Sequence, residues 1–424
     1  MDFILQLTIN GLLLGGFYAT VTLGFSTIWG VMRLINLAHG EFLLMGAFVA
    51  WFFFNPTREQ NLIIGSADGT ATAILLLLVG LLVGLLISNL PTLRTRFEIA
   101  WQRRLAAVAG TMILALILYL IWSSAGLIDV VISMMAIMMI ALALSLGFIF
   151  SHFVLPTRLP DPLQRRLVAY GGSGIVVLVF YSIWQGSDFA SIDPFLALPL
   201  VFPIFFALGY VLQRHLFNRV VEGPYLTMLL ITFAVSIILQ NIGLKIFRAD
   251  PRRINIDYGN AYYITENLTV PPVRVLILLI SAIMIAGLVW FLQRTRIGYA
   301  IRAAAQHKMA ARLMGINIRE TYAITFGVAI ALTGLAGAMM GMFQPITPVT
   351  GPMWTLRAFA IVALGGLGKV EGVIAGGFVL GLVESYIGGY IGIGWGIAAA
   401  FIILVLTLVT RPQGLTGGLQ PVEE

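Results

Sequence analysis

Apolar residues recur along the chain in runs of about 20, separated by short polar stretches. A helix of that length crosses the roughly 30 Å of hydrocarbon in a bilayer, and backbone groups there must be satisfied within the helix. The pattern predicts an all-α polytopic integral membrane protein with about 13 spans. The predicted spans are Phe3–Trp29, Ala38–Phe54, Ala73–Ser88, Leu105–Trp122, Leu127–Phe150, Leu167–Trp184, Phe195–Gln213, Leu226–Phe247, Val273–Leu292, Tyr322–Phe343, Trp354–Leu367, Gly372–Ile387 and Trp395–Val409.

One predicted span, Trp354–Leu367, is shorter than the others and ends in a glycine-rich turn. Glycine readily breaks a helix, because it adopts backbone conformations that other residues avoid. Two interpretations follow. Either this segment spans the bilayer as the others do, or it is a re-entrant or broken helix and the chain has 12 full spans.

The distribution of lysine and arginine predicts the orientation. With the N-terminus outside and the C-terminus inside, 18 of the 25 basic residues fall on the inner side. Arg357 is among those assigned to the outer side, as are the basic residues of the long loop 248–272. Short cytoplasmic loops of membrane proteins carry an excess of basic residues. The sequence therefore predicts an N-out, C-in arrangement.

Composition supports the membrane class and narrows the chemistry. Charged residues make up 10% of the chain and mean hydropathy is +0.98, whereas a soluble domain has roughly a quarter of its residues charged. The net charge of +7 resides in short loops, which indicates topology and not nucleic-acid binding. The chain has no cysteine, so disulfides and thiol chemistry are excluded, and its 4 histidines show no spacing typical of a metal site.

Two adjoining blocks, GLLLGGFYATVTLGFSTIWG at 11–30 and VMRLINLAHGEF at 31–42, closely resemble the N-terminal signature of branched-chain amino acid importer permeases, the LivH-type family. AFAIVALGGLG at 358–368 and TRPQGL at 410–415 are similar to that family's Gly-rich segment and C-terminal part. The resemblance leaves out residues 55–191, which supply four predicted spans. We therefore expect a permease core, 1–54 and 192–424, with an inserted accessory transmembrane bundle, 55–191.

The resemblance implies a transport subunit and not an enzyme. It implies the permease of an ATP-driven ABC importer for branched-chain amino acids, or related small amino acids and amides, in a bacterial inner membrane. Its partners would be a second permease subunit (a heterodimer), two cytoplasmic ATPases and a periplasmic binding protein, all amid membrane lipid and without nucleic acid. No cofactor is expected on this chain, because its Gly-rich stretch lacks the spacing of a P-loop, and ATP would be used by the partners.

Candidate substrate-path residues are polar groups and glycines in or beside the predicted spans: Asn36, His39, Glu41, Gln240, Asn241, Gly365, Gly366, Gly368 and Glu384. Ionisable groups inside a membrane are costly, so Glu384 either lines the path or pairs with a neighbour. The group around Glu41 either contacts substrate or caps a helix start. The two amides suit hydrogen bonds between helices. The three glycines suit a broken helix that exposes backbone dipoles to a zwitterionic solute.

The basic loop Arg294–Glu320 is the candidate contact with the ATPases. The family implies a short coupling helix here, with small residues that permit close approach and a glycine that ends the helix. The residues assigned to this role are Arg302, Ala303, Ala304, Ala305, Met314 and Gly315. An amphipathic helix lying in the membrane interface is the alternative interpretation.

A glycine pattern recurs near both ends of the chain, in Asn10–Phe17 and Glu371–Phe378, on helices predicted to run in opposite directions. Inverted repeats are common in transporters, although 45 glycines also produce such matches by chance. Two other function classes are less consistent with the sequence. An ion-coupled secondary transporter of small zwitterionic solutes is disfavoured by the scarcity of intramembrane Asp and Glu. A membrane enzyme would need a polar cluster at one depth, which the sequence does not indicate.

Overall fold

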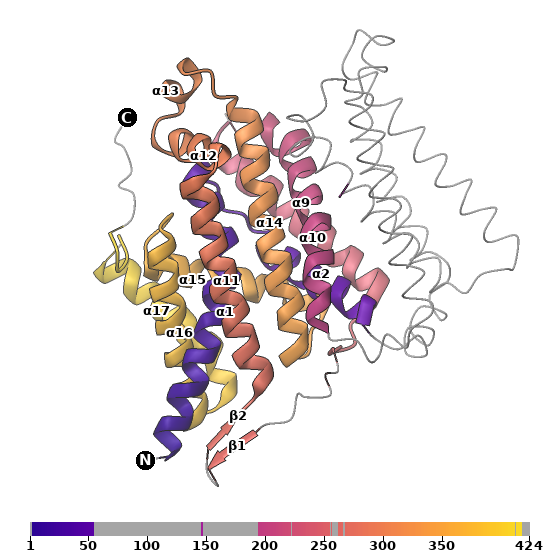
Figure 1. Ribbon diagram of the computed structural model, residues 1–424, viewed down its shortest axis with the longest axis vertical. Coiled ribbons are helices and arrows are strands. Elements are labelled where there is room, and N and C mark those ends of the chain that lie inside the picture. The colour runs from indigo at the N-terminus through magenta and orange to yellow at the C-terminus, as the bar shows by residue number, and fades with distance from the viewer. Residues whose placement is uncertain are drawn as a thin grey trace, which may run out of the picture.

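The computed structural model describes residues 2–54, 146, 194–221, 223–254, 256, 262–265, 268–411 and 413–417. These residues form a helical bundle with a two-stranded antiparallel hairpin (Figure 1). The elements are α1 (Asp2–Met32), α2 (His39–Phe54), η4 (Pro194–Ala197), α9 (Leu198–His215), η5 (Phe217–Arg219), α10 (Tyr225–Phe247), β1 (Tyr262–Thr265), β2 (Leu268–Val270), α11 (Pro272–Arg294), α12 (Arg296–Gln306), α13 (Lys308–Leu313), α14 (Ile318–Phe343), η6 (Pro348–Thr350), α15 (Gly351–Gly365), α16 (Val370–Tyr390), η7 (Ile393–Trp395) and α17 (Gly396–Thr410).

The described helices confirm the predicted all-α membrane architecture. Six of them are long and apolar enough to cross a membrane, namely α1, α9, α10, α11, α14 and α16, with α9 extended through η5. Two shorter apolar helices, α2 and α17, accompany them. The four spans predicted between residues 73 and 184, and the assignment of 55–191 as an accessory bundle, lie outside the described residues, residue 146 excepted.

Helix α14 is the centre of the bundle. Almost every residue between Thr321 and Met342 is buried, because α1, α2 and α9 pack around it. Small residues make this close packing possible. A methyl group added at Gly334 would meet the ring of Phe205 on α9, and one at Gly337 would meet the backbone of Leu43 on α2. In a bilayer, such small residues allow the van der Waals contacts that hold helices together.

Helix α2 begins inside the bundle and not at its surface. After α1 ends, residues 33–38 run back along it, so that the imidazole Nε2 of His39 lies 2.8 Å from the carbonyl oxygen of Val21. Val21 is well inside the 31-residue α1. From there α2 runs to the end of the bundle near α10, where Phe48 stacks on Phe247 with ring centroids 4.4 Å apart. Helix α2 therefore occupies only part of the membrane depth.

Helix α15 also begins at mid-depth. The indole of Trp354, in its first turn, contacts the rings of Phe17 and Tyr18 in the middle of α1, with centroids 5.9 and 6.2 Å apart. Its 15 residues rise about 22 Å, less than the hydrocarbon thickness. Of the two interpretations of Trp354–Leu367, the geometry matches a helix that starts within the bundle. It runs toward the end opposite to that reached by α2.

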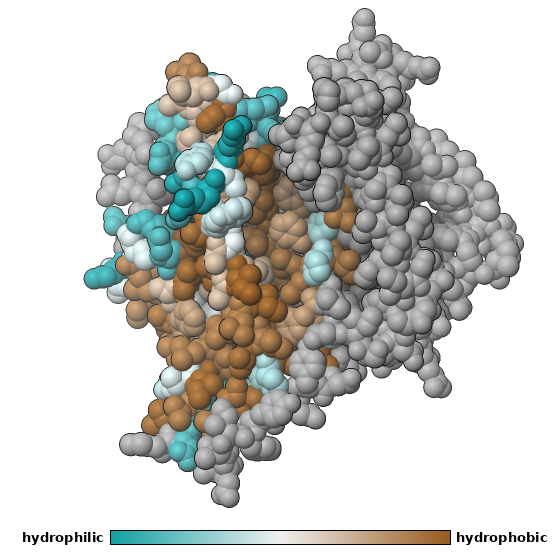
Figure 2. Space-filling model, in the orientation of Figure 1, coloured by the Kyte–Doolittle hydropathy of each residue, from teal (hydrophilic) through white to brown (hydrophobic). Residues whose placement is uncertain are grey.

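The hairpin lies at one end of the bundle, and α12 and α13 lie at the other (Figure 1). The side chain of Gln6 exchanges two hydrogen bonds, of 2.8 and 2.9 Å, with the backbone of Thr269, so the N-terminal end of α1 lies beside the hairpin. Helices α12 and α13 lie at the other end, at the top of the described residues in Figure 1. Figure 2 shows hydrophobic surface between the two ends and polar surface near α12. The assignment of the α12–α13 end to the inner side stays a prediction.

The glycine patterns noted in the sequence meet where Gly377 packs on Gly15, whereas Gly372 and Gly376 pack on α15. Helices α1 and α16 are antiparallel, with Gly15 beside Phe378 and Gly11 beside Leu382. A methyl group at Gly381 would lie 2.5 Å from the backbone nitrogen of Gly15. The recurrent glycines thus bring two backbones together. Their origin as an inverted repeat stays a prediction.

Candidate functional site

The first candidate group, Asn36, His39 and Glu41, surrounds the start of α2. The Asn36 carboxamide oxygen accepts a hydrogen bond from the backbone nitrogen of Ala38 at 3.1 Å, as a helix-start residue does. Glu41 lies in the first turn, where the helix dipole favours a carboxylate, and accepts a 3.3 Å hydrogen bond from Ser236 of α10. All three candidates are at most 1% exposed. Their contacts are those of a packed helix start.

The start of α15 packs directly on this group. The backbone nitrogen of Gly40 donates to the Thr355 hydroxyl oxygen at 2.8 Å, and Gly351 lies so close to the Glu41 carboxylate that a side chain at 351 would strike it. The positive ends of two helix dipoles therefore converge on one carboxylate. This junction of α2 and α15 is tightly filled, and it links two short helices that run to opposite ends.

Glu384 lies in a second polar cluster, at the depth of Tyr18. Its Oε1 is 3.1 Å from the guanidinium Nε of Arg357, and its Oε2 accepts a hydrogen bond from the Tyr18 hydroxyl. The guanidinium carbon of Arg357 lies 4.9 Å from the ring centroid of Trp354. The assignment of Arg357 to the outer side was wrong, because this residue lies in α15 and compensates a carboxylate inside the bundle. Of the two interpretations of Glu384, pairing with a neighbour is observed.

Gln240 and Asn241 lie apart from both clusters, on α10. Asn241 is exposed and its side-chain nitrogen donates to the carbonyl oxygen of Ile237 on the same helix, at 2.8 Å. The surrounding face of α10 is apolar and exposed, with Phe233 and Ile238 about half accessible. Neither amide joins the other candidate residues within the described part of the chain.

The glycine turn Gly365–Gly368 joins α15 to α16 at the end away from the hairpin. Gly366 and Gly368 have positive φ angles of 107° and 83°, which the tight turn requires. The carbonyl of Gly365 accepts hydrogen bonds from both the backbone nitrogen and the hydroxyl of Thr416, at 3.2 and 2.7 Å. The backbone group that was expected to face a solute is thus bonded to the C-terminal segment.

The candidate coupling residues occupy α12, α13 and the turn that follows. Of the three alanines, Ala304 is buried against the bundle, and Ala303 and Ala305 are half-buried. Arg302 is exposed and lies over the ring of Tyr299. Gly315 has a φ of 82° and ends α13, as the sequence predicts for a helix cap.

Helix α13 and the residue that follows it expose three apolar side chains, which we call the coupling tip: Met309 (58% exposed), Leu313 (82%) and Met314 (82%). Figure 2 shows hydrophobic surface at the top of the coloured part of the molecule, where Figure 1 places α13, with polar surface below it. Met314 was predicted from the sequence as a coupling residue, whereas Met309 and Leu313 were not. Their spacing of four residues, which places them on one face of a short helix, is the signal that was available.

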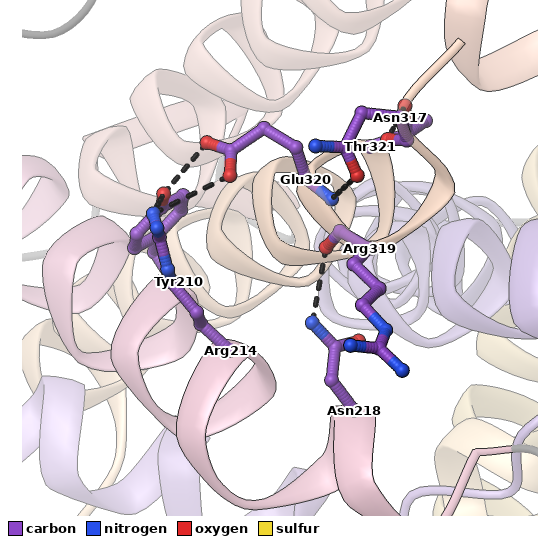
Figure 3. A network of polar contacts seen from close by, with 7 residues as sticks. All are labelled: Tyr210, Arg214, Asn218, Asn317, Arg319, Glu320 and Thr321. Atoms are coloured by element: carbon purple, nitrogen blue, oxygen red, sulfur yellow. Dashed lines mark hydrogen bonds and ion pairs between the residues drawn. The ribbon is translucent and has the colours of Figure 1, made fainter. Parts of the chain in front are cut away.

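A polar network connects the segment after the coupling tip to α9 (Figure 3). Glu320, in the first turn of α14, accepts a 2.6 Å hydrogen bond from the Tyr210 hydroxyl and pairs with Arg214 at 3.3 Å, while Arg214 also donates to the Tyr210 oxygen. Nearby, the Asn218 side chain donates to the carbonyl of Arg319 at 3.0 Å. The contacts between α9–η5 and α14 were not predicted, because their partners are more than 100 residues apart in sequence.

Comparisons with known proteins place these features in a family context. Residues 103–410 match the family model described as the permease component of branched-chain amino acid transport systems. The match runs through part of 55–191, whose assignment as an insertion stays a prediction. The chain is 29% identical over 218 residues to the high-affinity branched-chain amino acid transport system permease protein BraD of Pseudomonas aeruginosa. This alignment covers 50% of this chain and 70% of BraD.

Two further relatives carry the same description. LivH of Escherichia coli K12, a high-affinity branched-chain amino acid transport system permease protein, is 28% identical over 216 residues, covering 50% of this chain and 70% of LivH. A probable LivH of Methanocaldococcus jannaschii is 28% identical over 241 residues, covering 53% of this chain and 75% of that protein. No solved structure matches the chain.

Proposed function

The chain belongs to the family of permease components of branched-chain amino acid transport systems, and we propose on this basis that it is the membrane-spanning subunit of an ATP-driven importer. It is a multi-pass protein of the bacterial inner membrane. The proposed solutes are branched-chain amino acids or related small amino acids and amides. The observation that carries the proposal is the family match over 103–410, together with apolar helices of membrane-spanning length.

We propose that the partners are a second permease subunit, two cytoplasmic ATPases and a periplasmic binding protein. The coupling tip supports an ATPase contact, since three large apolar side chains exposed at one point mark an interaction surface. Flexible methionine side chains adapt well to a partner's groove. Arginine and lysine on the same segment, including exposed Arg312, would face acidic groups of the ATPase. An interfacial helix would instead place its apolar face against the bundle and the lipid.

The contacts behind the coupling tip support a role in transmitting movement. Gly315 separates α13 from α14 and has open space around it, so the two helices are joined by a single turn. The first turn of α14 is then held to α9 by Glu320 and Arg214 (Figure 3). A displacement of the tip would therefore reach α9 and α14, the central helix, without passing through a flexible loop.

The substrate path is proposed to follow α15 and α16. Of the path candidates, Asn36, His39 and Glu41 are enclosed at the α2–α15 junction, where they would set the relative position of two short helices. Glu384 and Arg357 form a charged pair in the same depth range, with the Arg357 side chain partly exposed. The described residues thus place charge on α15 and α16.

The test is ATP-dependent uptake of leucine, isoleucine and valine by the chain co-expressed with its partner subunits. Met314→Glu and Gly315→Leu should weaken ATPase association by about 2 kcal/mol or more, roughly 30-fold, because they place a charge or a strained side chain at the contact. Leu415→Glu is the matched control, since its side chain is 45% exposed and its backbone nitrogen donates to Leu364 at the end of α15. Co-purification of the ATPase and uptake are both measured.

Normal assembly and uptake in both tip variants would overturn the coupling assignment. Uptake that persists without an ATPase and collapses when ion gradients are dissipated would overturn the importer proposal in favour of an ion-coupled transporter.

A further inference from the structure

Arg357 carries a positive charge at the middle depth of the bundle. It follows Trp354 by one turn of α15, and Trp354 contacts Tyr18 near the centre of α1. Its partner Glu384 accepts a hydrogen bond from the same Tyr18. The Arg357 guanidinium therefore lies far from either end of the membrane-spanning helices, where a charge is expensive unless it is compensated.

Glu384 compensates the charge of Arg357 at only one side of the guanidinium. Only the Nε of Arg357 bonds to Glu384, at 3.1 Å, and the guanidinium rests against the Trp354 ring. Within the described part of the chain, its terminal Nη1 and Nη2 groups have no hydrogen-bond partner. An arginine has five N–H donors, and those at Nη1 and Nη2 are directed away from the carbon chain. Most of the donor capacity of Arg357 is thus unused.

Part of the Arg357 side chain is exposed. The Arg357 side chain is 18% exposed, whereas that of Glu384 is 7% exposed. Arg357 lies at a small and almost entirely apolar groove between α15 and α17, which are neighbours in Figure 1, together with Met353, Leu356 and Phe401. Lipid tails offer no acceptor for N–H groups, so the donors of Arg357 that have no partner in the described chain are stable only against water or a polar partner. A translocation path beside α15 would supply such a partner.

We propose that Arg357 binds the carboxylate of the amino acid as it passes through the translocation path. This rests on the proposed importer function and identifies a substrate contact within it. A planar guanidinium with two free amino groups suits a carboxylate, to which it can donate two parallel hydrogen bonds. Glu384 offsets part of the positive charge and, with Trp354, fixes the orientation of Arg357. The substrate is thereby held by one contact that is weak enough to release it, as transport requires.

Because the chain has no cysteine, single-cysteine variants test whether this face meets water. Arg357→Cys should react with a charged, membrane-impermeant methanethiosulfonate reagent, and saturating leucine should slow the reaction several-fold. Ile283→Cys is the matched control, because Ile283 is 69% exposed on an apolar face of α11 and should be shielded by lipid. Equal reactivity of the two cysteines, or none at position 357, overturns the proposal.

Uptake tests the chemistry of the contact. Arg357→Gln should lower leucine uptake by about 10- to 100-fold, the effect of losing a charged hydrogen-bond partner. Uptake by Arg357→Cys should recover after attachment of an aminoethyl group, which restores a positive charge, and not after attachment of a methyl group. Arg357→Lys should retain folding and ATPase binding while leucine uptake falls about 10-fold, because an ammonium lacks the planar fork. A purely structural ion pair would lower the amount of folded transporter instead.

Different results would contradict the importer function and the Arg357 contact. Absence of ATP-dependent leucine uptake by the unmodified transporter overturns the importer function and this inference with it. Normal uptake by Arg357→Gln, in a transporter that does require ATP, overturns this inference alone.

Discussion

The packing of α1 on α16 gives a quantitative prediction for Gly381→Ala. A methyl group at Gly381 would lie 2.5 Å from the backbone nitrogen of Gly15, 2.6 Å from its Cα and 2.6 Å from the carbonyl oxygen of Gly11. All three atoms belong to the backbone of α1, so no side-chain rotation relieves the overlap. The two helices must separate by about 1 Å, which forfeits up to half of the dispersion energy of the neighbouring contacts.

A second alanine substitution isolates the free-energy cost of the overlap between α1 and α16. Gly287 on α11 has no atom within 4 Å of an added methyl group. Glycine to alanine in a helix stabilises by up to about 1 kcal/mol, and this gain applies at both positions. The difference in unfolding free energy between Gly381→Ala and Gly287→Ala therefore measures the overlap alone. Overpacking of this kind costs about 1–3 kcal/mol.

The assay is reversible denaturation of the purified protein in a lipid–detergent mixture, read by tryptophan fluorescence and circular dichroism. Gly287→Ala should be as stable as the unmodified chain or more so, and Gly381→Ala should be less stable than Gly287→Ala by the amount above. Equal stability of the two variants would show that α1 and α16 are not in backbone contact at Gly381.

Two further predictions concern the ends of the bundle. Gln6→Ala removes both hydrogen bonds between α1 and the hairpin, each worth about 1 kcal/mol. Hydrogen exchange at the Thr269 amide should therefore accelerate about 10-fold or more, while exchange in α14 is unchanged. Glu320→Gln should lower the free energy of unfolding by less than about 1 kcal/mol, since Arg214 and Glu320 are each 32% exposed. It should nevertheless reduce leucine uptake, because the ion pair between α14 and α9 is lost (Figure 3). A large loss of stability with normal uptake would refute this prediction.

The positions of the long helices follow from hydrophobic run length. Phe3–Trp29 and Leu226–Phe247 were predicted, and α1 and α10 occupy nearly those residues. The agreement has a simple cause. The cost of placing a polar group in hydrocarbon is large and local, so the ends of an apolar run mark where a helix can leave the membrane. Packing partners do not change that limit.

Depth within the membrane was not predictable in the same way. Hydropathy alone does not distinguish a helix that starts at the surface from one that starts beside Val21 or Tyr18, because both kinds of helix are apolar. Arg357 illustrates the consequence. A basic residue near the predicted start of a span was assigned to the outer side, and only its pairing with Glu384, 27 residues away, places it inside the bundle. Such partners are fixed by tertiary packing, which no local pattern encodes.

The two proposed contacts are joined by a single stretch of chain. The coupling tip ends at Met314, α14 crosses the bundle from Ile318 to Phe343, and residues 344–350 lead back to mid-depth, where α15 begins and carries Arg357. Helix α14 is buried along almost its whole length, so it moves with its neighbours and not by itself. A displacement imposed at the tip would thus be delivered to the start of α15, where Gly351 packs on Glu41. Because α2 and α15 meet there and run to opposite ends, a tilt about this junction would open one end of the path as it closes the other, which is the movement that alternating access requires.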